Sequence, residues 1–153
     1  MQLRRFEPGD ADQIWALHES SITAIPAAQG EDYWADLRYV THHYIESGGE
    51  FLVGVVGDSL LAMGGFKPLS VGEVEIMRMR VHPNWQGRGL AGDLLRALER
   101  TAREGGYGRV YLETTVVQTP ALAMYRSHRY AELGRTTKGG FEVVQFRKTF
   151  AAD

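Results

Sequence analysis

Two closely spaced glycines mark the part of this chain whose residue types best suit ligand binding. Gln86-Gly87-Arg88-Gly89-Leu90-Ala91 lies between an extended run that ends at Val81-His82-Pro83 and a leucine-rich run that reaches Glu104. Glycine lets a backbone approach a ligand closely, and successive N–H groups at a helix start attract anions. The segment is therefore predicted to bind a pyrophosphate, although a glycine pair also occurs in plain strand-to-helix turns.

The elements expected before this loop come from hydrophobic spacing and turn residues. A short strand over Leu3 to Phe6 is followed by a helix from about Ala11 to Ser20, with Asp10 as N-cap and Gln13 at the capping-box position. Thr23 to Gly30 is typical of a loop. A second helix is expected from Tyr33 through Leu37, Val40 and Tyr44 to the glycines at Ser47-Gly48-Gly49.

Strands dominate the expected middle and end of the chain. Residues 51–56 and 60–66 flank Gly57-Asp58-Ser59 as a hairpin, and Glu73 to Val81 forms a strand whose imperfect alternation predicts a bulge. The remaining expected elements are a helix from Gly87 to Glu104, a strand from Arg109 to Thr114, a short helix to Ser127 with Thr119 as N-cap before Pro120, and a strand from Phe141 to Phe150.

Composition limits the classes of partner. The 153 residues predict a single domain spanning 1–153, with 44% hydrophobic and 24% charged residues as in an ordinary globular protein. Lys and Arg total 17 against 19 acids, and this net charge of −2 makes nucleic acid an unexpected partner. There is no cysteine for a disulfide or a cysteinyl intermediate, and the five histidines show no metal-ligand spacing. No long apolar run suggests a membrane span, so a cytoplasmic protein fits best.

Four motifs taken together resemble the GNAT superfamily of N-acetyltransferases. They are Val81-His82-Pro83, Gln86-Gly87-Arg88-Gly89-Leu90-Ala91, Leu112-Glu113-Thr114 and Ala121-Leu122-Ala123-Met124-Tyr125. The resemblance covers residues 51–135, and residues 1–50 diverge. Relatives usually have glycine before an aromatic residue after the tyrosine helix, where this chain has Arg129 before Tyr130. This departure indicates either a different helix end or a use for Arg129 near the cofactor.

The resemblance implies a mixed α/β fold and acetyl-CoA as the cosubstrate, with no metal. Its central, mostly antiparallel sheet would have about six or seven strands, splayed between the fourth and fifth, with about four flanking helices. Acetyl-CoA would lie in the V between those two strands. The backbones of Met79 and Val81 would bond its pantetheine arm, and its pyrophosphate would be held by Gln86, Gly87, Arg88, Gly89, Leu90 and Ala91.

Transfer to an amine would need a base, because an amine with a pKa of about 10.4 is protonated at neutral pH and only the neutral form attacks a thioester. Glu75 is the preferred candidate, acting directly or through water, with Glu113 and Glu73 in reserve. Glu75 is equally compatible with a strand carboxylate that pairs with Arg78 or Arg80.

Two further groups would act at the thioester. A backbone N–H freed by a bulge near Met79 would stabilise the charge that gathers on the thioester oxygen. Tyr125, with an ordinary pKa of about 10, would return a proton or donate a hydrogen bond to the departing thiolate, whose pKa is about 8.5.

Two rival functions share the glycine loop. A noncatalytic acyl-CoA-binding or sensing domain would lose the base and the acid, and the presence of Tyr125 argues against it. A nucleotide-binding regulatory module is disfavoured because no Lys-Ser/Thr follows the glycines.

The expected acceptor is a small-molecule or amino-acid-like amine, with a peptide N-terminus or lysine side chain as the alternative. Its selection would rest on the first two helices and on Thr23 to Gly30, while dimerisation stays open. The aromatic residues expected in the core are Trp15, Tyr33, Trp34, Tyr39, Tyr44 and Trp85. The cluster at 33 to 44 is alternatively the lining of the acceptor pocket.

Overall fold

A computed structural model of the chain describes residues 1–21 and 31–151. The loop expected at Thr23 to Gly30 lies outside these described residues. The α-helices are α1 Ala11–Ser21, α2 Leu90–Glu104 and α3 Thr119–Ser127. The strands are β1 Gln2–Arg5, β2 Glu50–Val56, β3 Ser59–Ser70, β4 Glu73–Val81, β5 Arg109–Thr115, β6 Ala131–Lys138 and β7 Phe141–Thr149.

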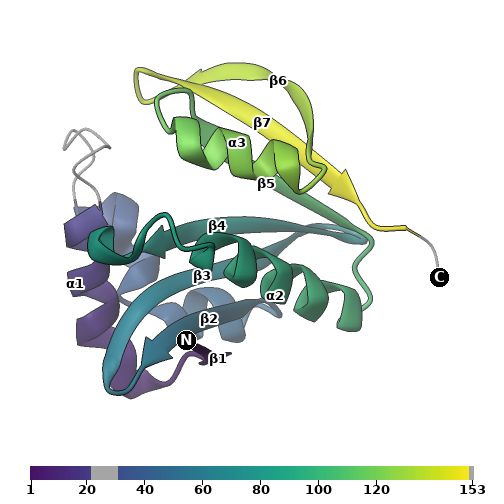
Figure 1. The fold of residues 1–153 in the computed structure, drawn as a ribbon. Helices are drawn as coiled ribbons and strands as arrows, with labels where there is room; N and C mark the ends of the chain where they lie inside the picture. The colour runs from purple at the N-terminus through teal and green to yellow at the C-terminus, as the bar shows by residue number, and fades with distance from the viewer. Residues whose placement is uncertain (22–30, 152–153) are drawn as a thin grey trace.

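The strands form one mixed sheet with the order β1-β2-β3-β4-β5-β7-β6. Every neighbouring pair is antiparallel except β4 and β5, which run parallel. Parallel pairing is confined to the start of both strands, and Figure 1 shows the sheet splitting open beyond it into a V. The predicted α/β fold with a sheet splayed between its fourth and fifth strands is confirmed.

Helices cover the two faces of the sheet with separate hydrophobic clusters. α1 buries Ile14 and Leu17 against Phe51 and Met63 on one face. On the other face α2 crosses β2 to β4 and α3 lies along β5 and β7, which leaves the V between these two helices (Figure 1). The strands β2 and β3 are therefore covered on both faces, whereas β6 at the far edge is largely exposed.

The leucine stripe of α2 packs as its spacing predicts. Leu94, Leu95 and Leu98 are completely buried, and burying a leucine fully contributes about 1.5–3 kcal/mol. The helix comes unusually close to β3 at Gly64, where an added Cβ would lie 3.0 Å from Met79 Cγ and 3.3 Å from Leu98 Cδ1. This close packing fixes the start of α2 beside the end of β4.

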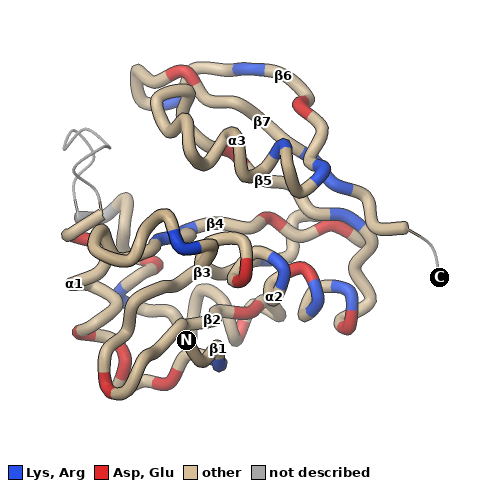
Figure 2. The backbone as a smooth tube through the Cα atoms, viewed as in Figure 1, with Lys and Arg blue, Asp and Glu red and all other residues tan. Residues whose placement is uncertain are grey.

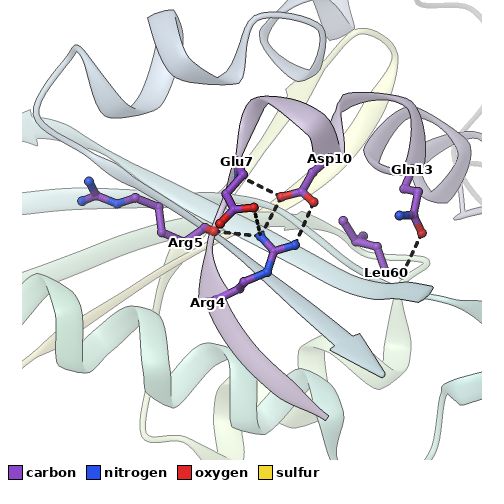
Figure 3. A network of polar contacts seen from close by, with 6 residues as sticks. All are labelled: Arg4, Arg5, Glu7, Asp10, Gln13 and Leu60. Atoms are coloured by element: carbon purple, nitrogen blue, oxygen red, sulfur yellow. Dashed lines mark hydrogen bonds and ion pairs between the residues drawn. The ribbon is translucent and has the colours of Figure 1, made fainter. Parts of the chain in front are cut away.

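The expected start of the first helix is wrong in two details. A 3-10 turn over Pro8–Asp10 precedes α1, and Asp10 accepts the backbone N–H of Glu7 at 2.8 Å instead of capping α1. Gln13 accepts the backbone N–H of Leu60 at 2.9 Å, so it forms no capping box. Figure 3 shows this network, in which Asp10 is also held by both terminal nitrogens of Arg4 at 2.8 Å.

The expected second helix is not one regular helix. A 3-10 helix covers Glu31–Leu37 and a π-helix covers Thr41–Ile45. Between them the chain bends so that the Tyr44 hydroxyl donates to Asp36 Oδ2 at 2.6 Å. Spacing predicted helical residues here, but this tertiary contact decides their geometry.

Three corrections apply to the second half of the chain. α2 begins at Leu90, not Gly87, because both glycines of the loop have left-handed φ. Thr119 is the first residue of α3, and Gln118 is its N-cap. The strand β6 was not expected, because its eight residues are largely polar and exposed.

Candidate functional site

The V between β4 and β5 contains a small polar cavity. The two strands pair only at Glu73–Arg109, Val74–Val110 and Glu75–Tyr111. Beyond this point they diverge around a cavity of about 180 Å³. The lining includes Tyr33, Trp34, Glu75, Arg78, Arg80, Glu113 and Lys138. Figure 2 shows that basic and acidic segments both occur along β4 at this site.

The glycine loop has the backbone conformation that anion binding needs. Gly87 has φ 77° and Gly89 has φ 80°, both in the left-handed region. An added Cβ at either glycine would meet no atom within 4 Å, so the angle and not local crowding calls for glycine. The first helical bond of α2 runs from Asp93 N–H to the Gly89 carbonyl at 3.1 Å. The N–H groups of Leu90 and Ala91 therefore have no partner within the helix.

Two side chains of the glycine loop, Gln86 and Arg88, contact neighbouring residues. The Gln86 Nε2 group donates to the Val81 carbonyl at 3.1 Å, which ties the loop to the end of β4. The Arg88 guanidinium lies 4.5 Å from the Trp85 ring centre. The backbone N–H groups at the start of α2 and the Arg88 guanidinium are both able to donate to an anion.

A bulge in β4 lies where the sequence predicted one. Arg78 and Met79 together oppose the single residue Gly64 of β3, and Arg78 has φ 61°. The Met79 carbonyl accepts from Arg80 Nη1 at 3.0 Å. His82 N–H bonds β3 at the Leu61 carbonyl, 2.7 Å away, so alternation turns the N–H of Val81 toward the V.

The three candidate carboxylates have different surroundings. Glu73 is buried and accepts from Arg147 Nε at 2.6 Å. Glu113 accepts from Lys138 Nζ at 2.7 Å and from the Tyr111 hydroxyl at 2.5 Å. Among the residues that the structure describes, Glu75 has neither a hydrogen bond nor an ion pair. The alternative in which Glu75 pairs with Arg78 or Arg80 is therefore wrong.

These surroundings separate the carboxyl pKa values. Burial, followed by repulsion from Glu113, raises the pKa of Glu75 above its ordinary value. Burial alone would also raise the pKa of Glu113, but hydrogen bonds from Lys138 and Tyr111 outweigh it and hold that pKa low. Of the two carboxylates in the cavity, Glu75 is thus the stronger base and the one with free oxygens.

Tyr125 reaches the V from α3. Its ring packs against Tyr130 and Phe146, with centroid distances of 5.9 Å to each, and its hydroxyl lies 3.8 Å from Met79 Sδ. Burial raises the pKa of Tyr125 to about 12, although the nearby charge of Arg80 lowers it. The hydroxyl therefore keeps its proton at neutral pH and is able to donate a hydrogen bond or a proton.

Arg129 adopts the conformation that glycine usually has at a helix end. Its φ is 70°, its N–H bonds the Arg126 carbonyl at 3.1 Å, and Tyr130 N–H bonds the Tyr125 carbonyl at 3.0 Å. This is a Schellman turn. The alternative in which α3 ends differently is therefore wrong, and the left-handed backbone costs about 1 kcal/mol relative to glycine.

Sequence reasoning missed a buried polar cluster beside the cavity. Arg78 donates to both carboxylate oxygens of Asp36 at 3.0 Å, and its guanidinium lies 4.4 Å from the Trp34 ring centre. Burial raises the pKa of Asp36, but the bonds from Arg78 outweigh it and lower the pKa overall. Asp36 is 42 residues from Arg78, so no local pattern could have revealed the pair.

The aromatic residues at 33 to 44 have three different environments. Tyr44 is fully buried, Tyr39 is exposed, and Tyr33 and Trp34 line the cavity. Within the described residues, no three His, Cys, Asp or Glu side chains are grouped to hold a metal ion. None of the described helices is long and apolar enough to cross a membrane.

Known proteins are similar to this chain in sequence and in fold. N-alpha-acetyltransferase RimI from Mycobacterium tuberculosis is 38% identical over 113 residues, which cover 69% of this chain and 66% of that protein. N-acetyltransferase 8F1 from Rattus norvegicus is 26% identical over 105 residues, which cover 65% of this chain and 48% of that protein. The chain spans about half the length of such mammalian relatives.

A structure of yncA from Salmonella typhimurium with its cofactor acetyl-CoA has the same fold. Its TM-score is 0.78 at 18% identity, with 100% of this chain and 97% of that chain covered. Residues 13–129 match the Acetyltransferase (GNAT) family, from the first turn of α1 to the turn after α3. With this match and the splayed sheet, the chain belongs to the acetyltransferase (GNAT) family.

Proposed function

We propose that residues 1–153 act as one domain that transfers the acetyl group of acetyl-CoA to the primary amine of a small-molecule or amino-acid-like acceptor. The amine would attack directly in a ternary complex. The observation that carries the proposal is the position of Glu75, a carboxylate without a polar partner among the described residues, in the V formed by β4 and β5. A binding-only domain would have no need of such a base.

The residues of the V fit acetyl-CoA. The N–H groups at the start of α2 and the left-handed Gly87 and Gly89 suit a pyrophosphate. The Met79 and Val81 carbonyls already accept side-chain hydrogen bonds, so their N–H groups are the ones assigned to the pantetheine arm. The bound cosubstrate supplies an activated acyl group and a thiolate leaving group.

Glu75 is assigned the role of base. Its raised pKa strengthens it as a proton acceptor, and its free oxygens can receive a proton directly or through a water. The bulge at Arg78 and Met79 interrupts the β3–β4 ladder beside the V. A backbone N–H at this interruption is assigned to the oxygen on which charge gathers.

Tyr125 is assigned to the leaving thiolate. With a pKa of about 12, its hydroxyl is a weaker acid than in water. Complete proton transfer to a thiolate whose ordinary conjugate-acid pKa is about 8.5 is therefore uphill. A hydrogen bond from Tyr125 to the sulfur is the role that this environment favours.

A peptide N-terminus is the second candidate acceptor. It is favoured by the 38% identity to a protein named as an N-alpha-acetyltransferase. Both candidates present a primary amine, so they share the same base and the same cosubstrate.

Thiol release tests the proposal. Purified protein is mixed with acetyl-CoA and a panel of amines that includes free amino acids, small amines and peptides, and free thiol is followed over time. Amine-dependent release is expected. Binding of acetyl-CoA without release by any member of the panel would instead indicate a noncatalytic acyl-CoA-binding domain.

A further inference from the structure

Arg80 is a partly buried cation that has no anionic partner among the described residues. Its Nε atom is buried and has no hydrogen-bond partner among the described residues, while its Nη1 atom donates to the Met79 carbonyl at 3.0 Å. In the part of the chain that the structure describes, no carboxylate pairs with it. Removing part of a guanidinium from water without a counter-charge destabilises a fold, so the presence of Arg80 here requires an explanation.

The neighbours of Arg80 do not supply the missing charge. Asp36 is engaged by both nitrogens of Arg78, and Glu113 is engaged by Lys138. The Trp34 ring centre lies 5.7 Å from the Arg80 guanidinium carbon, which offers a weak cation–π contact. Burial, followed by repulsion from Arg78, lowers the pKa of Arg80 to about 10. Arg80 thus remains charged at neutral pH.

His18, whose pKa responds to the charge of Arg80, is itself uncharged at neutral pH. His18 is buried between Trp15 and Trp34, with ring centroids 5.2 Å and 4.5 Å away. Burial, followed by the charges of Arg80 and Arg78, lowers the pKa of His18 to about 4. His18 therefore brings neither a compensating negative charge nor a second positive one.

Arg80 shares its cavity with the proposed base. Both Arg80 and Glu75 line the V, and neither has a charged partner among the described residues. The charge of Arg80 also lowers the pKa of the Tyr125 hydroxyl, although burial raises that pKa more. Two opposite, unpaired charges in one small cavity complement a molecule that carries both an amine and an anion.

From this arrangement we infer that the acceptor carries a carboxylate, as a free amino acid does, and that Arg80 binds it while Glu75 receives the proton of the amine. This inference rests on the acetyl transfer proposed above. A planar guanidinium matches a carboxylate with two parallel hydrogen bonds, and Arg80 lines the cavity that also holds Glu75. A peptide N-terminus presents an amide in place of the carboxylate, and a polyamine would meet the cations Arg78 and Arg80.

Binding of unreactive product analogues tests the inference without turnover. A panel of N-acetyl amino acids that differ in side chain is titrated into the protein with CoA present, beside the matching carboxamides. For at least one side chain the carboxylate should bind roughly 10- to 100-fold more tightly than the carboxamide, the range of a charge-assisted pair. Equal affinities for every pair would overturn the inference.

Variants assign the preference to Arg80. Arg80→Gln should reduce the carboxylate-to-carboxamide ratio to near 1, and Arg80→Lys should restore part of it. Arg135→Gln makes the same charge change on the exposed strand β6 and should keep the wild-type ratio. A ratio that survives in Arg80→Gln, with a native circular dichroism spectrum, would also overturn the inference.

Thiol release then separates this inference from the proposed function. Release with carboxamide amines but not with free amino acids would overturn the carboxylate site and leave acetyl transfer intact. Release with neither class, together with an Arg80-dependent carboxylate preference in binding, would overturn the transfer and support the anion site. Faster release with free amino acids than with their carboxamides is the expected result.

Discussion

Replacing Glu75 with glutamine separates a catalytic role from a structural one. The change keeps the shape of the side chain and removes its charge. Because Glu75 has no polar partner among the described residues, no hydrogen bond or ion pair of the fold is lost. Turnover at neutral pH should fall by roughly 10²-fold or more, the usual contribution of a general base.

The dependence on pH gives this prediction its diagnostic value. The deficit of Glu75→Gln should shrink as pH rises toward the pKa of the amine, because a neutral amine needs no base. In the wild type, turnover should fall in acid at a pH above the ordinary glutamate range, since burial and Glu113 raise the pKa of Glu75. An equal deficit at every pH would refute the role of base.

The thermal stability of Glu75→Gln provides a test that does not depend on turnover. Folding raises the pKa of the Glu75 carboxyl. The resulting loss of stability develops as pH rises from the ordinary glutamate pKa to the raised one, and it is absent in more acidic solution. Glu75→Gln should therefore have an equal or higher Tm at pH 7, and the difference should vanish at low pH.

Glu73→Gln is the matched control. It breaks the bond to Arg147 at 2.6 Å and should cost about 1–3 kcal/mol, a value discounted because Arg147 is partly exposed. It should therefore lower Tm and leave the pH profile of turnover in place. Loss of turnover in Glu73→Gln with full activity in Glu75→Gln would transfer the role of base to Glu73.

Three further predictions concern the loop, the leaving group and the buried cluster. Gly89→Glu should abolish acetyl-CoA binding in calorimetry with the fold intact by circular dichroism, whereas Gly57→Glu, at φ 58° in the β2–β3 turn, should bind normally. Tyr125→Phe should lower kcat roughly 10- to 10³-fold with little change in acetyl-CoA affinity. The decrease in kcat should be smaller with an acyl donor whose thiol is more acidic. Full activity of the variant would mean that Tyr125 only packs in the core. Asp36→Asn should cost about 2–4 kcal/mol by leaving Arg78 uncompensated, measured by urea unfolding; an unchanged midpoint would contradict this.

Elements with strong local patterns could be predicted from the sequence. The hairpin around Gly57-Asp58, the bulge in β4 and the apolar face of α2 follow from turn residues and from periodicity. The strand β6 was missed because a polar, exposed edge strand has no alternation to reveal it. One helix was predicted in place of the two short helices within residues 31–45, because the helical spacing of apolar residues continues through the bend between them.

The sequence motifs predicted where the candidate site lies, but they could not predict which of its charged side chains have partners. Gly87 and Gly89 identify the loop because no other residue adopts left-handed φ as readily. Which glutamate is unpaired depends on partners far along the chain, such as Arg147, which lies 74 residues from Glu73. The partial burial of Arg80 is likewise a tertiary property.

The most direct test of the account follows the acetyl group itself. Isotopically labelled acetyl-CoA is mixed with the protein and with an acceptor from the panel, and both the acceptor and the intact protein are examined by mass spectrometry. Direct attack in a ternary complex predicts label on the acceptor amine, one free thiol for each acetyl group transferred, and no labelled protein when the acceptor is omitted. Label retained on the protein, or thiol release that is independent of any amine, would contradict it.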